Sequence, residues 1–352
     1  GEWRFGHLSY DLKAEIEGLA SLHANKTGFT DLCFFVPQYV LQLSETELKI
    51  GSVLNDHDSI FAAIKAQELP GTENKQALHI QERISRMEYM DAIETIRKHI
   101  LRGDCYELNY CMEFFAEDVQ LDPLYCYQSL TTISPNPFSA FYKVNNSYLL
   151  CASPERFLRK EENKLISQPI KGTIKRNTTD AADDELLKQQ LYKSEKDRSE
   201  NVMVVDLVRN DLSRVCKEGS VQVDELFGIY SFPQLYQMIS TISGEVNETL
   251  SFTDVLCATF PMGSMTGAPK RKVMQLIEQY EQSRRGLFSG AVGYISPTDD
   301  FDFNVVIRSI FYNAATNYLS YMVGSGITYY SNAEQEYEEC LLKADAIRKV
   351  LG

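Results

Sequence analysis

The sequence predicts an α+β protein in which large antiparallel β-sheets pack against helices. Strand-like segments follow one another directly in several places, whereas a doubly wound parallel fold would alternate strands with helices. The chain has 352 residues, of which 44% are hydrophobic and 24% charged, so it can bury a large core. No repeat or linker-like tract interrupts it, and we expect a single domain over residues 1–352.

The composition also argues against two classes of partner. The net charge is −14, and an acidic surface repels the phosphate backbone of nucleic acids, although it permits a small anionic substrate. No run of about 18 apolar residues is present, so no membrane span is expected. The eight cysteines form no CxxC pair and no secretory signal precedes them, which predicts buried, reduced thiols and a cytoplasmic protein.

The first clear helix follows a less regular N-terminal segment. Residues 1–84 contain short apolar runs separated by polar residues, which is typical of strands joined by loops. The sequence does not begin with Met, and we expect residues to be missing at this end. Apolar residues then recur every three or four positions from Met87 to Ile100, with Gly103 just beyond, which predicts an amphipathic helix ended by glycine.

The rest of the chain is predicted to contain groups of strands separated by helices. Turn-bounded apolar or alternating runs mark strands in the segments 105–117, 134–144, 147–160, 163–176, 289–296, 301–313 and 317–327. Helical spacing marks the segments 183–209, 272–281 and 332–351. Because the strand segments come in adjacent groups, most should pair as antiparallel neighbours.

The last predicted helix carries charged residues on one face. Glu336, Glu339 and Lys343 recur at spacings of three and four, so they lie on the same side of the helix. A solvated ion pair, contributing a few tenths of a kcal/mol, would explain them. Alternatively, this face lines a cavity and its carboxylates hold a hard metal ion.

Two further segments contain candidate groups for binding an anion. In GSMTGAPKRK, Ser264 or Thr266 can cap a helix whose free N–H groups favour a carboxylate, although an ordinary helix start explains the segment equally well. Arg308 lies within an apolar strand-like run, and a buried guanidinium needs an anionic partner. That partner is either a carboxylate of the protein or a carboxylate of a substrate.

Ordered motifs over about three quarters of the chain resemble those of the chorismate-utilising enzymes. They are SPERF, PIKGT, KDRSEN with DLVRNDLSRV, GSMTGAPK, SGAVGY, VVIRS, GSGI and EYEECLLKA. So many long motifs in one order are highly specific. The resemblance implies that residues 85–352 form a catalytic, chorismate-binding region with the fold of anthranilate synthase component I.

Three features make the chain similar to the branch that forms aminodeoxychorismate. PIKGT has Lys171 where anthranilate synthases typically have alanine, and NPFSAF at 136–141 differs from their NPSPYMFF. Isochorismate-forming members have a lysine base at the position of Glu107. Three positions depart from the pattern: Glu107 replaces the usual glutamine of this branch, Gln237 stands where many members have histidine, and Ser325 makes GSGI of the commoner GGGI.

The resemblance implies a magnesium site and a general acid. Glu200 and Glu339 match the magnesium ligands of the family, and Glu336, about one turn before Glu339, is expected close behind. Two carboxylates, waters and a substrate carboxylate make an ordinary Mg²⁺ shell. Glu155, in SPERF, matches the acid that protonates the departing 4-hydroxyl group, so burial should raise its pKa.

The resemblance also implies groups that hold the substrate, because chorismate is a dianion that needs cations and backbone donors. The matching residues are Tyr294, Arg308, Lys343, Gly324, Ser325, Gly326, Ser264, Thr266 and, within PIKGT, Thr173.

Lys171 stands between an apolar Pro-Ile pair and a glycine. In the branch that the chain resembles, the equivalent lysine is thought to attack C2 of chorismate as the 4-hydroxyl leaves; ammonia then adds at C4 and displaces the lysine. Such an amine must be neutral part of the time, which requires a pKa lowered by desolvation. The alternative is that Lys171 remains a cation in contact with a carboxylate.

The expected function is therefore that of a magnesium-dependent enzyme of the aminodeoxychorismate synthase component I type. Such an enzyme converts chorismate and ammonia to 4-amino-4-deoxychorismate on the route to p-aminobenzoate and folate. No amidotransferase domain is visible, so a separate glutamine amidotransferase subunit should supply the ammonia. The alternatives are an anthranilate synthase component I and a catalytically silent chorismate-binding scaffold, against which Glu155, Glu200 and Glu339 argue.

Overall fold

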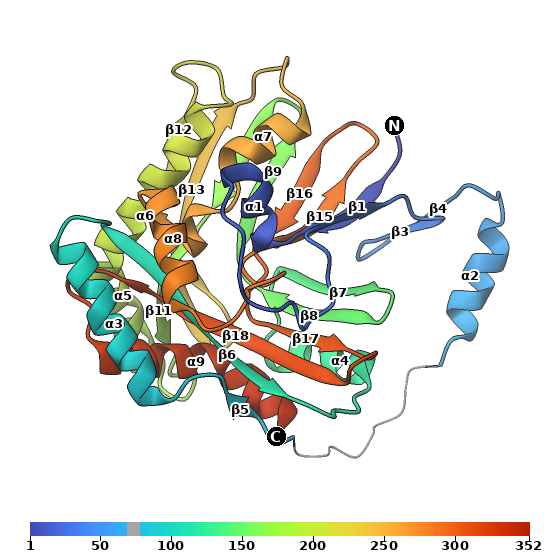
Figure 1. The fold of residues 1–352 in the computed structure, drawn as a ribbon. Helices are drawn as coiled ribbons and strands as arrows, with labels where there is room; N and C mark the ends of the chain where they lie inside the picture. Colours follow the sequence, from blue (N-terminus) through green and yellow to red (C-terminus); the bar gives the residue numbers. More distant parts are fainter. Residues whose placement is uncertain (69–77) are drawn as a thin grey trace.

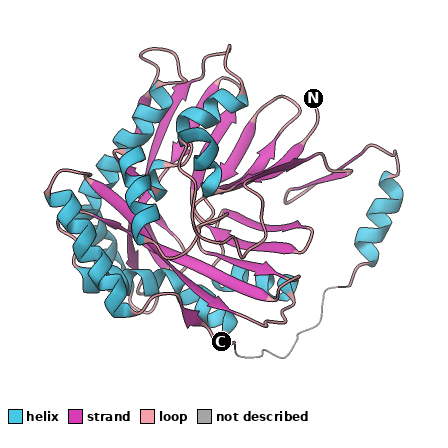
Figure 2. Cartoon of the chain, viewed as in Figure 1, coloured by secondary structure: helices cyan, strands magenta, loops and turns pink. Residues whose placement is uncertain are grey.

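The computed structural model describes residues 1–68 and 78–352 and confirms the α+β class. Two large β-sheets form the body of the molecule, with helices packed around them (Figure 1, Figure 2). Every strand pair between these described residues is antiparallel, as the adjacent strand segments predicted.

The larger sheet has nine strands in the described part of the chain. They are β1 (Arg4–Leu8), β2 (Leu32–Phe35), β9 (Arg156–Glu161), β10 (Lys164–Gln168), β11 (Ile170–Lys175), β12 (Gln222–Ser231), β13 (Leu235–Glu245), β15 (Ala291–Ile295) and β16 (Phe301–Asn304). Their order is β11-β13-β10-β9-β16-β15-β1-β2, and β12 also pairs with β13. The N-terminal strand β1 therefore lies inside this sheet, between β2 and β15.

The second sheet has seven strands in the same described ranges. They are β5 (Gln81–Glu82), β6 (Glu107–Ala116), β7 (Phe138–Val144), β8 (Ser147–Ser153), β14 (Gly267–Ala268), β17 (Ser309–Asn313) and β18 (Tyr318–Ile327). Their order is β14-β6-β18-β17-β8-β7, and β5 pairs with β6. A small separate hairpin consists of β3 (Tyr39–Leu43) and β4 (Leu48–Ser52).

Helices cover both large sheets. They are α1 (Lys13–Glu17), α2 (His57–Ala66), α3 (Arg86–Leu101), α4 (Pro123–Ile133), α5 (Ala181–Lys193), α6 (Glu195–Ser213), α7 (Phe252–Thr259), α8 (Lys270–Tyr280) and α9 (Ala333–Leu351), with the 3₁₀ turns η1 (Tyr10–Leu12) and η2 (Gly263–Met265). Helices α3, α4 and α9 pack with the seven-stranded sheet, whereas α5 and α6 pack against β11, β12 and β13 of the larger one.

Two hydrophobic cores hold these layers together. One lies between the two sheets, and the other lies between the seven-stranded sheet and the helices that include α3 and α9. Neighbouring residues of β8 alternate between them: Leu149 belongs to the first core and Leu150 to the second. Because successive side chains of a strand point to opposite faces, β8 is apolar on both sides and reads as a continuous hydrophobic run.

Three predicted strands are each divided in the structure. Segment 147–160 forms β8 in one sheet and β9 in the other, and segment 301–313 likewise forms β16 and β17. Segment 163–176 breaks at Pro169, which has no N–H for a strand ladder. The prediction that Arg308 lies within a strand is therefore wrong: it lies between β16 and β17 with a φ of 53°.

Two helix predictions have different outcomes. Helix α3 forms as predicted, with a capping box at Ser85 and Glu88, and Gly103 follows it with a φ of 79°. The segment predicted as one helix over 183–209 is two helices, α5 and α6. Ser194 separates them, and its hydroxyl accepts a hydrogen bond from the backbone N–H of Asp197, as expected of an N-cap residue.

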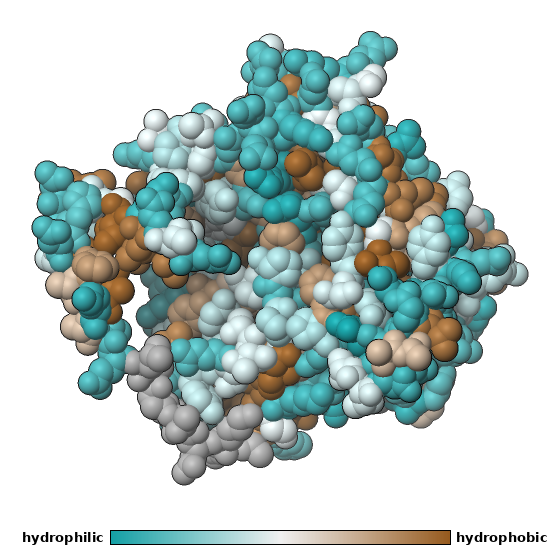
Figure 3. Space-filling model, turned by 180° about the vertical axis from the view of Figure 1, so that it is seen from behind, coloured by the Kyte–Doolittle hydropathy of each residue, from teal (hydrophilic) through white to brown (hydrophobic). Residues whose placement is uncertain are grey.

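The β3–β4 hairpin and α2 project from the body (Figure 1). Apolar side chains are exposed on this projection, among them Leu43 and Phe61, and Figure 3 shows apolar surface on its helix. Across the described ranges, no helix combines the length and the apolar character needed to cross a membrane.

Candidate active site

A cavity lies where the two sheets meet, close to the points at which the predicted strands are broken. It measures about 770 Å³ including its open mouth. Its walls come from the β8–β9 connection, β11, α6, η2, the β16–β17 connection, β18 and α9. Of the sequence-predicted site residues, it brings together Glu155, Lys171, Thr173, Glu200, Ser264, Arg308, Gly324, Gly326, Glu339 and Lys343.

Lys171 forms a buried ion pair in this cavity. Its Nζ donates a hydrogen bond of 2.6 Å to Oε1 of Glu107, whose side chain is only 1% exposed. Burial by itself would lower the pKa of Lys171, but the carboxylates of Glu107 and Glu200 outweigh burial and raise it. The expectation of a lowered lysine pKa is therefore wrong for this state of the protein, because Glu107 replaces a neutral side chain with a charged partner.

Contacts with helix α6 fix the backbone around Lys171. Gly172 has a φ of 99°, which a residue with a side chain rarely adopts, and a Cβ there would lie 3.0 Å from Cβ of Asp197. The amide of Asn201 donates to the carbonyl of Lys171 (3.5 Å) and accepts from the hydroxyl of Ser240 (2.6 Å). Helix α6 thus fixes the strand that presents the lysine.

Glu155 lies between β8 and β9, directly after Pro154. Its backbone N–H donates to the hydroxyl of Ser153 (3.2 Å), and its carbonyl accepts from the N–H of Val305 (3.0 Å). Burial raises the pKa of Glu155 to about 7, although Ser264 and Lys171 act in the opposite direction. The side chain therefore keeps a proton up to neutral pH, as a general acid requires.

Three carboxylates on α6 and α9 face a pair of lysines. Lys196 Nζ lies 2.9 Å from Oε1 of Glu336 and 3.8 Å from Oε1 of Glu200, and Lys343 Nζ lies 2.7 Å from Oε1 of Glu339. Burial raises the pKa of Glu200 to about 8, whereas Lys343 and the neighbouring lysines outweigh burial and lower the pKa of Glu339.

These carboxylates fit a hard cation. Oε1 of Glu200 and Oε2 of Glu336 are buried and accept no hydrogen bond from any residue that the structure describes. A cation beside them would satisfy both oxygens and would keep Glu200 ionised. Within the described ranges, no set of three His, Cys, Asp or Glu side chains forms a metal site by itself, so waters or substrate would have to complete the shell.

Arg308 supplies an unpaired cation. No ion-pair partner for its guanidinium occurs among residues 1–68 and 78–352, although it lines the cavity. Burial lowers the pKa of Arg308 to about 10, so the group remains charged at neutral pH. A buried guanidinium without an anion is costly, and no protein carboxylate pairs with Arg308 among the described residues. A substrate carboxylate is therefore the favoured partner.

The remaining cavity groups come from β18 and α9. Lys343 Nζ donates to the carbonyl of Gly324 (2.8 Å), which joins α9 to β18. Gly326 leaves room for the ion pair: a Cβ at this position would lie 2.7 Å from Nζ of Lys171 and 2.9 Å from Oε1 of Glu107. The glycines of GSGI thus lie within strand β18. Gly326 lets the ion pair of Lys171 and Glu107 lie close to the backbone of this strand.

Four predicted residues do not line the cavity. Tyr294 is on β15, with its ring 5.5 Å from that of Trp3 and 6.0 Å from that of Phe5. The hydroxyl of Ser325 points to Tyr89 (3.0 Å), and the hydroxyl of Thr266 donates to the carbonyl of Met262 (3.0 Å). Glu336 is absent from the cavity lining, and its Oε1 accepts a hydrogen bond from Nζ of Lys196 (2.9 Å). The predicted helix cap in GSMTGAPK is also wrong, because α8 begins after Pro269 without a side-chain cap.

Sequence reasoning did not assign roles to three groups near the cavity. Lys196 and Asp197 precede Glu200 by four and three residues on α6, so helical spacing could have placed them on its face. Asn109 on β6 also lines the cavity. Its strand was predicted, but the face toward the site depends on pairing with β18, which the local sequence does not reveal.

Comparison of this chain with known protein sequences indicates one family. A family model described as "chorismate binding enzyme" matches residues 1–349. The chain is 36% identical to the chloroplastic aminodeoxychorismate synthase of Arabidopsis thaliana, over 97% of this chain and 39% of that protein. It is 33% identical to aminodeoxychorismate synthase component 1 of Salmonella typhimurium, over 97% of this chain and 75% of that protein. The chain thus spans about two fifths of the plant relative.

Solved structures give a similar result. Anthranilate synthase component I from Streptococcus pneumoniae superposes with a TM-score of 0.85 at 27% identity, covering 98% of this chain and 80% of that one. The menaquinone-specific isochorismate synthase of Escherichia coli shares the fold, with a TM-score of 0.79 at 19% identity over 99% of this chain and 79% of that one.

Proposed function

Because this chain belongs to the family of chorismate-binding enzymes, we propose that it is an aminodeoxychorismate synthase component I. It would convert chorismate and ammonia to 4-amino-4-deoxychorismate and water. The observation that carries this proposal is the amine of Lys171, which lies inside the cavity and within hydrogen-bonding distance of Glu107. The names of the relatives at 32–36% identity, aminodeoxychorismate synthases, support the same activity.

The first step requires Lys171 to lose its proton. We propose that Glu107 accepts it, since its Oε1 is already 2.6 Å from Nζ and its Oε2 has no hydrogen-bond partner among the described residues. The neutral amine then forms a bond to C2 of chorismate, the ring double bonds shift, and the C4–O bond breaks. Glu155 gives its proton to the departing hydroxyl, which leaves as water.

The second step restores the enzyme. Ammonia forms a bond to C4, the double bonds shift back, and the bond between C2 and Lys171 breaks. The carboxylate of Glu155 takes the proton that the new amine must lose, and Glu107 returns a proton to Lys171. The protons therefore balance within the site, and no external acid or base is needed.

Charged groups hold the dianion during both steps. We propose that Arg308 binds one carboxylate, because its guanidinium is available in the cavity. Glu200 and Glu339, with Glu336 behind them, would hold Mg²⁺, whose charge would neutralise a substrate carboxylate. The partly buried lysines Lys196 and Lys343 would orient these carboxylates.

Several wider expectations belong to the same proposal. We propose that residues 1–352 act as one domain, since β1 is paired on both sides within the larger sheet. A glutamine amidotransferase subunit would supply ammonia, as the name "component 1" of the bacterial relatives suggests. A cytoplasmic location is in keeping with cysteines of which five are buried.

The proposal is tested by comparing the products that the natural protein and the Lys171→Ala variant form. The protein is incubated with chorismate, ammonium and Mg²⁺, and the products are identified by mass spectrometry and fluorescence. We expect aminodeoxychorismate from the natural protein and at least about a hundredfold less from Lys171→Ala, because the nucleophile is lost. Release of fluorescent anthranilate by the natural protein would support the anthranilate synthase alternative. Chorismate binding without turnover would support the scaffold.

A further inference from the structure

A second cavity adjoins the one described above, and we call the two the outer cavity and the substrate cavity. The outer cavity measures about 530 Å³ including its open mouth. Its walls come from the end of α4, from β11, from the β12–β13 turn and from α9. Lys175 and Gln234 in its wall are exposed, so it reaches the surface. Gln237, Arg308 and Lys343 line both cavities, which therefore meet at these three side chains.

Strand β11 leads from one cavity to the other. Lys171 and Thr173 line the substrate cavity, and Lys175, the last residue of the same strand, lines the outer cavity. Thr173 lies opposite Gln237 in the pairing of β11 with β13, so both lie near the junction of the cavities. At about 3.3 Å per residue, the strand covers about 13 Å between Lys171 and Lys175. A molecule that binds at Lys175 is therefore a short distance from the reacting amine.

The outer cavity is cationic, although the whole chain has a net charge of −14. Its wall contains Lys175, Arg308 and Lys343. The acidic residue in its wall is Asp345, whose carboxylate lies 2.6 Å from Nζ of Lys349. Lys175 and Arg308 form no ion pair with any residue in the part of the chain that the structure describes. A cationic opening in an otherwise acidic chain attracts a dianion.

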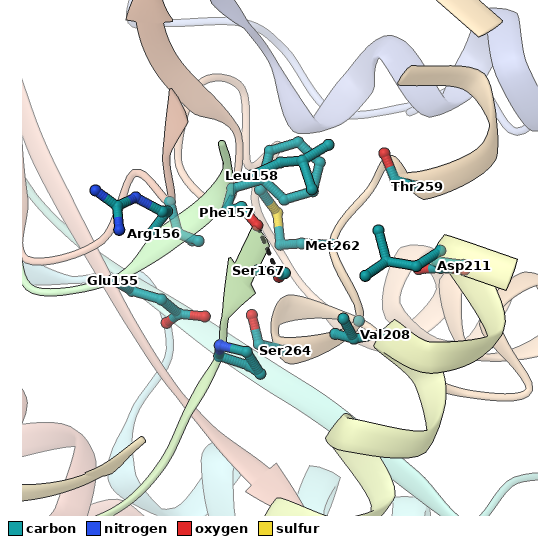
Figure 4. A pocket seen from close by; sticks show the side chains of 14 residues that line it. Glu155, Arg156, Phe157, Leu158, Ser167, Val208, Asp211, Thr259, Met262 and Ser264 are labelled. Atoms are coloured by element: carbon teal, nitrogen blue, oxygen red, sulfur yellow. Dashed lines mark hydrogen bonds between the residues drawn. The ribbon is translucent and has the colours of Figure 1, made fainter. Parts of the chain in front are cut away.

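The other sides of the substrate cavity are less suited to the entry of a dianion. The carboxylates of Glu200 and Glu339 line it on α6 and α9, whereas neither lines the outer cavity. Behind Glu155, the side chains labelled in Figure 4 are buried, apart from the part-buried Arg156, which donates to Asp302 (2.9 Å). None of the labelled residues is exposed, so this side offers a dianion no opening at the surface.

Two side chains at the junction of the cavities are free to receive a ligand. Gln237 is 2% exposed, and its Oε1 accepts no hydrogen bond from the described residues. Turning this side chain aside breaks no hydrogen bond to its oxygen, and binding at Arg308 breaks no ion pair. A carboxylate can therefore pass these two side chains without first displacing a partner within the protein.

We propose that the outer cavity is the site at which chorismate first binds, and that Nζ of Lys175 attracts a carboxylate of the dianion before Arg308 receives it. This inference rests on the function proposed above. Lys175 does not line the substrate cavity, so it acts on the approach of the substrate and not on the reacting atoms. Removing its charge should therefore slow association, which lowers kcat/KM, and leave kcat unchanged.

Reversing this charge tests the proposal. In Lys175→Glu we expect kcat/KM for chorismate to fall about tenfold at an ionic strength of about 10 mM and less than about threefold at about 200 mM, because salt screens an exposed charge. We expect kcat and the KM for ammonium to change less than about twofold. Lys175→Arg keeps the charge and should behave like the natural protein.

Lys272→Glu is the matched control. It makes the same change in net charge, and Lys272 is exposed on α8, where it lines neither cavity. We expect this variant to keep kcat/KM for chorismate within about twofold of the natural value at both ionic strengths. Equal values of kcat/KM in Lys175→Glu and Lys272→Glu at low ionic strength would overturn the proposal, and so would a loss in Lys175→Glu that salt does not reduce.

A binding measurement separates this proposal from the proposed function. The association rate constant of chorismate, measured by stopped-flow fluorescence without ammonium, needs no turnover, and we expect it to fall about tenfold in Lys175→Glu at low ionic strength. If the natural protein forms no amino product while this rate constant falls as expected, the proposed function fails and the role of the outer cavity stands. An active natural protein with an unchanged rate constant in the variant refutes the role of the outer cavity alone. A natural protein that does not bind chorismate refutes both.

Discussion

At the scale of single residues, the buried pair of Lys171 and Glu107 determines how the site can work. A lysine that is already paired with a carboxylate is a poor nucleophile until its proton moves. Transfer to Glu107 needs no exchange with solvent, because the two groups are in contact and both are buried. Both groups are therefore charged at rest, and a single proton transfer from Lys171 to Glu107 gives the neutral amine.

Replacing Glu107 with Gln tests this transfer. Glu107→Gln removes the proton acceptor and introduces the glutamine that is usual in the branch that the chain resembles, so Lys171 must exchange its proton with solvent. We expect turnover at neutral pH to change less than about tenfold, but to rise with pH on the acid side of the profile. Glu113→Gln is the control, because Glu113 is buried on the same strand but pairs with Arg83 outside the cavity. A pH profile of Glu107→Gln that matches that of the natural protein would exclude Glu107 as the acceptor.

The protonation of Glu155 predicts the alkaline limit of activity. Its pKa is raised to about 7, so the carboxyl holds its proton below that pH and loses it above. We expect kcat/KM to fall as pH rises through about 7, and Glu155→Gln to lose at least about a hundredfold in kcat at every pH. The pH dependence of kcat/KM measures this, and an activity that stays constant from pH 6 to about 9 would contradict the role of acid.

At the scale of the elements, the site depends on breaks in the strands. Glu155 and Arg308 lie in two of the connections that carry the chain from one sheet to the other, β8–β9 and β16–β17, and Lys171 lies just after the break at Pro169. In a continuous strand, successive side chains would point to opposite faces of the sheet. The breaks instead let these side chains face the space between the two sheets. Residues from segments far apart in the sequence thus meet in one cavity.

Strand β18 contributes to the site by leaving space. In Gly326→Ala, the added methyl group would displace Nζ of Lys171 and Oε1 of Glu107, which are flexible ends of side chains. We expect turnover to fall at least about tenfold while the stability changes by only about 1 kcal/mol. Kinetics and thermal unfolding measure the two effects. Gly51→Ala, on the exposed strand β4, is the control and should alter neither; normal activity of Gly326→Ala would show that the space is not required.

At the scale of the whole molecule, raised carboxyl pKa values link stability to pH and to a cation. Burial raises the pKa of Glu155 to about 7, of Glu200 to about 8 and of Asp211 to about 6. The folded protein therefore holds protons that the unfolded chain has lost between about pH 5 and 8. Stability falls as pH rises through this window, because ionisation of these groups is easier in the unfolded chain.

Magnesium should reverse part of this loss. At pH 8 Glu200 must ionise in its buried position, and a bound cation would offset the cost of burying the charge. We expect Mg²⁺ to raise the melting temperature by several degrees at pH 8 and by less at pH 5. Differential scanning calorimetry measures both, with Glu200→Gln as the control in which the effect is lost. Equal shifts at the two pH values, or an unchanged shift in Glu200→Gln, would argue against Glu200 as a ligand.

The sequence by itself determined the α+β class, the helices α3 and α9 and the family to which the chain belongs. These follow from local spacing and from long ordered motifs, which do not depend on how distant segments meet. Most of the residues that line the substrate cavity were also predicted, because the motifs name them directly.

Only the tertiary structure decided which motif residues share the cavity and how they are charged. Tyr294, Ser325 and Thr266 belong to the same motifs but face other neighbours, since the direction of a side chain depends on strand pairing and packing. The ionisation of Lys171 depends on Glu107, which is 64 residues away in the chain but 2.6 Å away in space. Such a pKa follows from burial and from distance to other charges, and neither quantity can be obtained from the local sequence.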